Sequence, residues 1–222
     1  MRRRSFRLRA CATAGQVGGA VLAVLIATAA PAAAQTTSSP GPWVVDVRGV
    51  TSPVPIDPAF YPPLDSAFVP ARGFGLDVGA HVYVFNFGPA RVGLGANLVM
   101  LRGTASPPPP TVEDGGSTAV QRLTVGMRVI APQVSLNFGS HDGWSYLSAG
   151  LGAASVNAEA TEVLPGRHES GLLRAVNFGG GARWFLTERL AFGFDLRAHQ
   201  IAAGADTPKV SVFAVGAGLS IR

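Results

Sequence analysis

The chain has 222 residues, of which 47% are hydrophobic and 14% charged, and 28 are glycine. Its formal net charge of +5 comes from the arginines between Arg2 and Arg9, because the rest of the chain has 13 basic and 13 acidic residues. This balance excludes a nucleic-acid partner recognised through general basicity. The only cysteine is Cys11, in the same segment, so the remainder has no disulfide, no cysteine metal ligand and no cysteine nucleophile.

Residues 1–34 have the three parts of a secretory signal peptide. A positive segment, Arg2–Arg9, precedes the apolar core Val17–Ala30, and three alanines end the segment before Gln35. We predict cleavage after Ala34 and export by the general secretory route. Cys11 precedes the apolar core, so it is not a lipidation site. Residues 35–42 are expected to form a flexible leader, and residues 43–222 a single barrel domain.

Alternation of apolar with small or polar residues marks the strands. It is clearest in 72–85 and 90–102, two runs joined by an Asn-Phe-Gly-Pro turn at 86–89. One face of this hairpin is apolar throughout, and the other has glycine and charged residues, a pattern typical of strands that cross a membrane in a barrel. In 43–50 Asp46 and Arg48 share a face with Val44 and Val50, so the inward face of that strand stays open. The remaining strand-like segments are 121–138, 144–156, 171–185, 190–201 and 209–221.

The connections alternate in length. Long segments at 51–71, 103–120 and 157–170 alternate with short turns at 86–89, 139–143 and 186–189. Eight strands with this alternation predict an all-β fold, an eight-stranded antiparallel up-and-down transmembrane β-barrel, with the short turns and both termini in the periplasm. In 121–138 the apolar face changes near Ala131-Pro132, which predicts a β-bulge there.

Polar residues on the inward faces are expected to fill the lumen, because an eight-stranded barrel is just wide enough for side chains. Buried charges must pair, so we predict ion pairs of Asp77 and Asp195 with Arg128, Arg183 and Arg197. The inward glycines leave open the alternative of a narrow conduit or a pocket. The predicted polar network comprises Asp77, His81, Arg91, Asn97, Arg128, Arg183, Asp195 and Arg197, with Arg122, Asn137 and His199 on the same faces.

Aromatic residues gather beside the short turns and at the start of the first strand. Such rings are common at membrane interfaces, so we predict an interfacial aromatic belt. The alternative is a set of ordinary core aromatics. The predicted belt comprises Trp43, Phe85, Phe87, Phe138, Trp144, Tyr146, Trp184, Phe185 and Phe192.

The segment Asn177–Arg197, NFGGGARWFLTERLAFGFDLR, resembles the late Gly-rich strand, turn and Arg-ended strand of eight-stranded outer-membrane β-barrel proteins. The barrel domain of outer-membrane protein A and the small opacity-type proteins belong to this group. The resemblance implies a barrel in the bacterial outer membrane, whose partners are membrane lipid, lipopolysaccharide and the barrel-insertion machinery. Such barrels usually end in an aromatic residue, whereas this sequence ends in Ile221-Arg222.

Three functions remain open. The first is a structural or surface-interaction role, with the long loops meeting partners or lipopolysaccharide. The second is a narrow passive pore for small solutes, and the third is a membrane-embedded lipid-modifying enzyme. At the level of fold, a soluble lipocalin-like barrel is the rival, and it would turn Leu94 and Leu196 inward.

We expect no enzyme activity, no cofactor and no metal. The nearest candidates for a catalytic relay are His168, Glu169 and Ser170, which are consecutive in a loop and need not converge. The four histidines are scattered, without metal-ligand spacing. The run Gly179–Gly181 does not open a helix, so it is not a phosphate-binding loop.

Overall fold

The computed structural model describes residues 41–54, 69–106, 122–139, 142–161, 166–205 and 207–222. The predicted signal peptide, residues 35–40 of the leader and the middle of each of the three long loops lie outside these residues. No described segment forms a helix long and apolar enough to span a bilayer.

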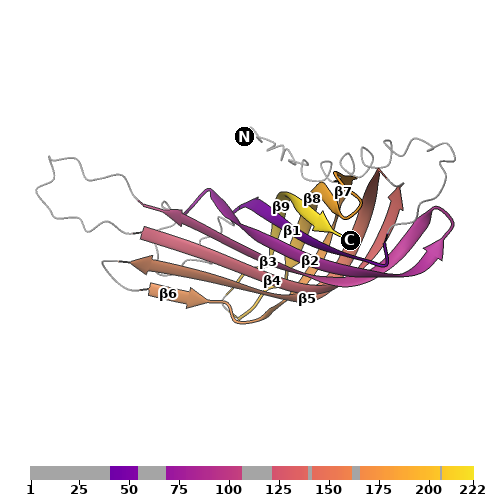
Figure 1. Ribbon diagram of the computed structural model, residues 1–222. Helices are drawn as coiled ribbons and strands as arrows, with labels where there is room; N and C mark the ends of the chain where they lie inside the picture. The colour runs from indigo at the N-terminus through magenta and orange to yellow at the C-terminus, as the bar shows by residue number, and fades with distance from the viewer. Residues whose placement is uncertain (1–40, 55–68, 107–121, 140–141, 162–165, 206) are drawn as a thin grey trace, which may run out of the picture. The chain divides into compact units, whose positions relative to one another are not determined.

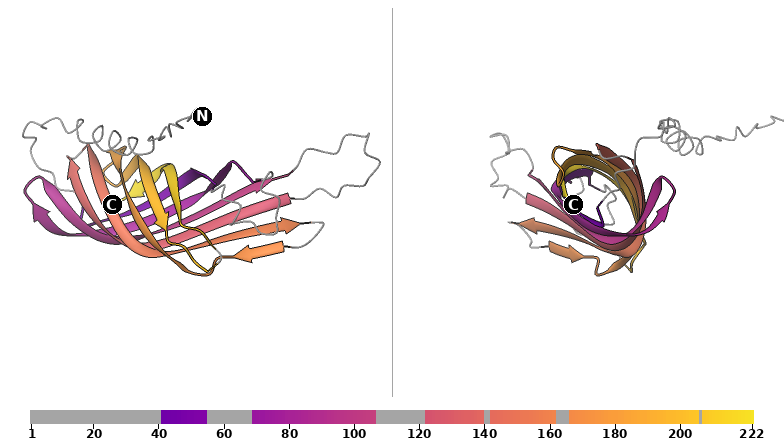
Figure 2. Two further views of the ribbon diagram at one scale, coloured as in Figure 1. Left: turned by 180° about the vertical axis from the view of Figure 1, so that it is seen from behind. Right: turned by 45° about the vertical axis from the view of Figure 1, so that its right-hand side comes forward.

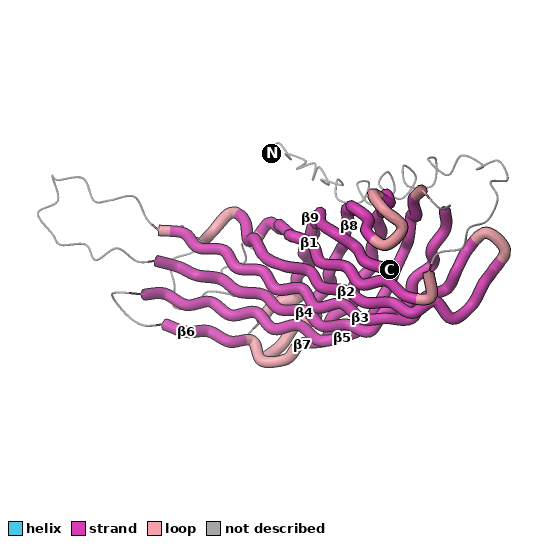
Figure 3. The backbone as a smooth tube through the Cα atoms, viewed as in Figure 1, coloured by secondary structure: helices cyan, strands magenta, loops and turns pink. Residues whose placement is uncertain are grey.

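The described residues form a closed antiparallel β-barrel (Figures 1 and 3). Its sheet order is β4-β3-β2-β1-β9-β8-β7-β5, and β4 pairs with β5 to close the ring, so eight strands make the wall as predicted. One further short strand, β6, is not part of this wall and pairs with β5 beyond the point where β7 ends. The strands are β1 Trp43–Pro53, β2 Arg72–Phe87, β3 Ala90–Ala105, β4 Arg122–Gly139, β5 Gly143–Thr161, β6 Gly166–Glu169, β7 Leu173–Phe185, β8 Leu190–Ile201 and β9 Val210–Ile221.

The connections sort into two ends of the barrel. The hairpin ends of β2 and β3, of β4 and β5, and of β7 and β8 lie at one end of the barrel, which we call the short-turn end. The opposite end is called the long-loop end. Gly88 has a φ of 56° in the β2–β3 turn, a left-handed conformation that glycine adopts without a steric penalty. Towards the long-loop end β3, β4 and β5 extend beyond their neighbours (Figure 1).

The predicted bulge at Ala131-Pro132 is wrong. The register between β3 and β4 is unbroken through Ala96 opposite Pro132, and β4 keeps one register with β5 on both sides of the proline. Apolar residues change from the inner to the outer face here while the backbone alternation continues. The register shift in this part of the barrel is instead in the β2–β3 hairpin, between Tyr83 and Phe85.

The outer face is apolar along most of each wall strand. Leu94 and Leu196 are both 47% exposed and point away from the lumen, opposite to the arrangement expected of a soluble lipocalin-like barrel. The interior, seen along the barrel in the right-hand view of Figure 2, is where charged and amide side chains are buried. An apolar outer wall around buried charged residues is the arrangement of a membrane barrel.

The interior itself has two regions. The part towards the long-loop end, which we call the apolar half, is a cluster of buried aliphatic side chains. A cavity of about 20 Å³ at its edge has room for roughly one water molecule. Its members are Val50, Val54, Val99, Leu101, Leu123, Val125, Met127, Val129, Ala154, Val156, Ala158, Leu173, Ala175, Ile201, Val212 and Ala214.

Candidate functional site in the barrel interior

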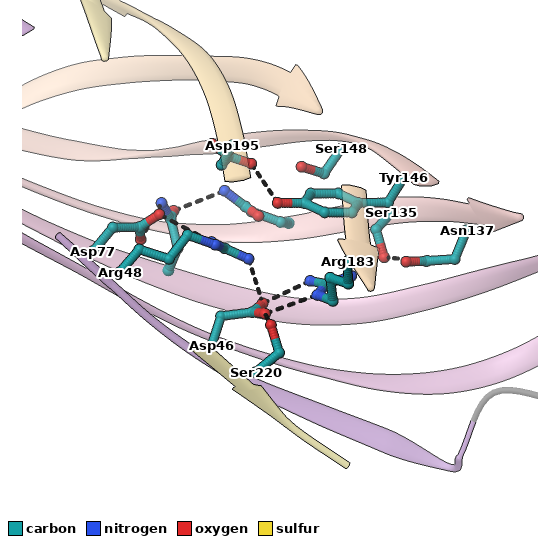
Figure 4. Close-up of polar contacts among 12 residues, drawn as sticks. Asp46, Arg48, Asp77, Ser135, Asn137, Tyr146, Ser148, Arg183, Asp195 and Ser220 are labelled. Carbon is teal, nitrogen blue, oxygen red and sulfur yellow. Dashed lines mark hydrogen bonds and ion pairs between the residues drawn. The ribbon is translucent and has the colours of Figure 1, made fainter. Parts of the chain in front are cut away.

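The part of the interior towards the short-turn end, the polar half, is built around Asp46 of β1 (Figure 4). Arg183 of β7 donates Nε to Oδ1 at 2.8 Å and Nη2 to Oδ2 at 2.7 Å, a two-point contact that matches the carboxylate. Ser220 of β9 donates its hydroxyl to Oδ1 at 2.5 Å. Strands β1 and β7 are separated by β9 and β8 in the wall, so the Arg183–Asp46 pair crosses the lumen.

Arg48 extends the network around the wall. Its Nη2 lies 2.8 Å from Oδ2 of Asp46, and its Nη1 donates to Oδ2 of Asp77 at 3.2 Å. The amide of Asn97 donates to the other oxygen of Asp77 at 3.4 Å. Gln133 then donates to Asn97 at 2.7 Å and to Asn177 at 3.0 Å, so polar contacts connect β1, β2, β3, β4 and β7.

A further ion pair lies within β8. Arg197 donates Nε and Nη2 to the two oxygens of Asp195 at 3.0 and 2.9 Å. The two side chains share a face because they are two residues apart on one strand. Arg197 also donates to Ser148 at 2.9 Å, and Tyr146 donates its hydroxyl to Asp195 at 2.6 Å, so this pair is tied to β5.

Aromatic rings fill the lumen at the short-turn end. Trp144 packs edge-on against Tyr83, with ring centroids 5.4 Å apart, and lies 5.3 Å from Phe185. The guanidinium of Arg222 lies 3.9 Å from the centroid of Phe185 and its Nε donates to the carbonyl of Glu188 at 2.6 Å. This end of the lumen is therefore filled by rings and capped by a cation.

Six of the eight residues predicted for the lumen network lie buried inside the barrel: Asp77, His81, Asn97, Arg183, Asp195 and Arg197. Arg91 is partly exposed. Arg128 is exposed on the outer face, so its predicted pairing with the lumen carboxylates is wrong. Arg122, on the same face of β4, is also exposed and lies outside the lumen. The inward side chains of this part of β4 include Leu123 and Val129, which pack in the aliphatic cluster of the apolar half.

The prediction missed the centre of the network. Asp46 and Arg48 are 1% and 4% exposed and lie inside, but they share their face with Val44 and Val50. Because this inward face of β1 contains both apolar and charged residues, the sequence pattern does not show which face of the strand points into the barrel. Inward Tyr146 was also missed, because it was assigned to the outer belt.

The predicted belt divides between the two faces. Trp144 and Tyr146 are 2% and 3% exposed and lie inside, and Phe185 packs against Trp144, so these three are not on the outer wall. Inward glycines make room for the rings: a Cβ at Gly181 would lie 2.8 Å from the Tyr146 hydroxyl. The other six, all well exposed, are Trp43, Phe85, Phe87, Phe138, Trp184 and Phe192.

The remaining candidates are the serine of the predicted relay and the buried histidines. Ser170, beside His168 and Glu169, accepts a hydrogen bond from the Val156 N–H at 2.9 Å and donates to the Gly171 carbonyl, so its hydroxyl serves the backbone. His81 and His199 are buried, and neither ring nitrogen of either has a hydrogen-bond partner among the described residues. The described residues contain no group of three or more His, Cys, Asp or Glu arranged to hold a metal ion.

No protein-family model matches the sequence, and no curated protein matches it. Among solved structures, Neisserial surface protein A aligns over 82% of this chain and 97% of its own, with a TM-score of 0.52 and 11% identity. Ail, the attachment invasion locus protein of Yersinia pestis, in a complex with the heparin analogue sucrose octasulfate, aligns over 80% of this chain and 97% of its own. The TM-score is 0.48 and the sequence identity 13%. The N-terminal β-barrel domain of Pseudomonas aeruginosa OprF aligns over 81% of this chain and 96% of its own, with a TM-score of 0.38 and 15% identity. The alignment with Neisserial surface protein A shows that the chain has the fold of the small outer-membrane β-barrel proteins.

Proposed function

We propose that this protein is an outer-membrane β-barrel with a structural or surface-interaction role, whose lumen is plugged by its own side chains. The observation that supports the plug is the two-point Arg183–Asp46 contact across the lumen, between side chains that are 2% and 1% exposed. Its neighbours Arg48 and Asp77 extend the ionic contact to a second side of the wall.

Two barriers in series then oppose the passage of solutes. In the polar half, a hydrated ion would have to separate buried ion pairs, and breaking such a pair costs about 3–5 kcal/mol. In the apolar half, the packed aliphatic side chains offer an ion no ligand, and desolvating a charge there is more costly still. The lumen therefore holds the barrel rigid rather than conducting.

The outer wall supports the membrane assignment. Its six exposed aromatic residues at or near the short-turn end, Trp43 and Trp184 among them, fit an interfacial belt. In this orientation the short-turn end faces the periplasm and the long loops face outward, where they meet surface partners and lipopolysaccharide. The signal peptide of residues 1–34 delivers the chain to the envelope, and the barrel-insertion machinery places it in the membrane.

Conductance in planar bilayers tests the plugged lumen. We expect the full-length protein to insert without producing stepwise currents. Clear, reproducible steps at low voltage would establish the passive pore instead.

Fractionation tests the location separately. The protein should appear in the outer-membrane fraction and migrate faster on gels when unheated than when boiled, because the folded barrel resists the detergent. A protein recovered soluble from the periplasm would contradict the membrane assignment.

Unchanged lipid A mass spectra after deletion of the gene would count against the lipid-modifying enzyme.

A further inference from the structure

On four strands an arginine follows directly where the outward apolar band ends. Towards the long-loop end the last large apolar side chains facing outward are Phe74, Met100, Ile130 and Val176. The next outward residues on the same strands are Arg72, Arg102, Arg128 and Arg174, all exposed. On β1, β8 and β9 the outward residues towards this end are Thr51, Gln200 and Ser211, with the exposed Lys209 just before β9. On β5 they are Ser155, Asn157 and the exposed Glu159. Among the described wall strands, arginines that directly follow the outward apolar band therefore lie on β2, β3, β4 and β7.

Three of these residues, Arg72, Arg102 and Arg128, form what we call the arginine line. Arg102 lies opposite Phe74 on β2 and opposite Gly126 on β4, so Arg72 and Arg128 are its diagonal neighbours. Diagonal neighbours on one face of a sheet lie about 7–8 Å apart, so the line extends over roughly 15 Å. None of the three takes part in an ion pair with another described residue.

A hollow of about 210 Å³ lies on the outer wall of these strands and of β1, which contributes Val45, on the membrane side of the arginine line. It exists because two small residues, Ala80 and Ala96, lie opposite each other on β2 and β3. The walls include Leu98 and Ile130, and Ile130 is two residues, about 7 Å, along β4 from Arg128. A hydrocarbon chain that descends from the arginine line along the wall would enter this hollow.

We propose that the outer wall of β2, β3 and β4 is a binding site for one phosphorylated, acylated lipid of the lipopolysaccharide kind. The arginine line holds the headgroup, because guanidinium groups form two-point hydrogen bonds with phosphate. Three cations over roughly 15 Å suit a headgroup with more than one phosphate better than a phospholipid with one. One acyl chain occupies the hollow between Ala80 and Ala96.

This inference rests on the proposed function, since it needs the long-loop end in the outer leaflet. It differs from general interfacial attraction, in which arginine stems lie along apolar surface and their head groups seek any anionic lipid. The difference can be measured because Arg174 offers a matched control. It is exposed and follows the apolar band as the others do, but it lies on β7, away from the hollow.

The test is binding of diphosphoryl lipid A to the full-length barrel in detergent, followed by native mass spectrometry or fluorescence titration. We expect the Arg102→Gln and Arg128→Gln variants each to weaken binding about tenfold, and Arg174→Gln to weaken it less than twofold. Ala96→Leu, which fills the hollow, should weaken binding of lipid A while leaving binding of its deacylated headgroup unchanged. Phosphatidylglycerol should bind weakly and with little dependence on these residues.

Gel mobility without heating is measured for every variant, so that loss of binding is read only from folded barrels. Equal losses for Arg174→Gln and Arg102→Gln, or equal affinities for lipid A and phosphatidylglycerol, would overturn the site and leave the membrane barrel intact. Failure of the wild-type protein to enter bilayers would instead overturn the proposed function, and the site with it.

Discussion

The two halves of the barrel interior are stabilised by different interactions. In the polar half Asp46, Asp77 and Asp195 each pair with an arginine from a defined direction, so a side chain there has specific partners. In the apolar half the buried cluster consists of hydrophobic side chains, so their stability depends on how closely they pack. The stability of the polar half should therefore depend on single charged or polar groups. The stability of the apolar half should depend on the volume of its side chains. The following predictions measure that difference.

The largest effect is expected from Asp46→Ala. It leaves Arg48 and Arg183 buried without their shared carboxylate, which should destabilise the barrel by about 3–5 kcal/mol. Urea unfolding in detergent micelles, followed by tryptophan fluorescence, measures the loss. The matched control is Glu169→Ala, which breaks the exposed ion pair with Arg167 and should cost less than about 1 kcal/mol. Equal losses in the two variants would show that the buried network adds no special stability.

In the apolar half, Ile201→Ala should cost about 2–5 kcal/mol, because the residue is fully buried and its neighbours cannot close the space. The same unfolding experiment applies, and Leu196→Ala on the outer wall is the control, since lipid or detergent refills that position. A loss at Ile201 no greater than at Leu196 would mean that the apolar half is loosely packed.

A smaller loss is expected from Tyr146→Phe. The change removes the hydroxyl that donates to Asp195 at 2.6 Å and keeps the ring, so we expect a loss of about 1.5–3 kcal/mol. The variant Tyr83→Phe is a suitable control, because the Tyr83 hydroxyl lies 3.5 Å from its acceptor in Asn137 and donates a weaker bond. The prediction fails if both variants unfold at the same urea concentration.

The smallest expected effect is on conductance. The double variant Asp46→Ala, Arg183→Ala removes both charges of the cross-lumen pair, yet the apolar half remains in series with the opened region. We therefore expect no stepwise current from the folded variant in planar bilayers. Steps that appear only in the double variant would show that the polar half alone closes the lumen.

Sequence periodicity was sufficient for the eight wall strands and the loop alternation, because each outward face is apolar over a long span. It missed β6 and the end of β5, which lie in the segment 157–170 that was predicted to be a loop. It failed where the interior is itself apolar. In 122–139 both faces have an apolar run, Leu123–Val129 inside and Val134–Phe138 outside, so Arg128 was assigned to the lumen and a bulge to Pro132. A face that changes character along one strand cannot be assigned from alternation alone.

The candidate site shows the same limit. Asp77, Arg183 and Asp195 were found because their strands have a clearly apolar opposite face. The partner of Arg183 is Asp46, which is 137 positions away and lies on a mixed face, so no local pattern joins the two. Trp144 and Tyr146 lie beside a short turn as belt residues do, and only the space left by inward glycines such as Gly181 turns them inside.

The contacts of Asp46 also bear on the order of assembly. Its hydrogen-bond partners lie 137 and 174 residues later in the chain, on β7 and β9. Contacts of such sequence separation form slowly, because the chain entropy of closing the loop is lost before they contribute. Ser220 reaches Asp46 only when β9 pairs with β1, the step that joins the first strand to the last. The seam of the barrel and the final contact of its charged centre therefore form in one cooperative event, and an open barrel keeps Asp46 in water until then.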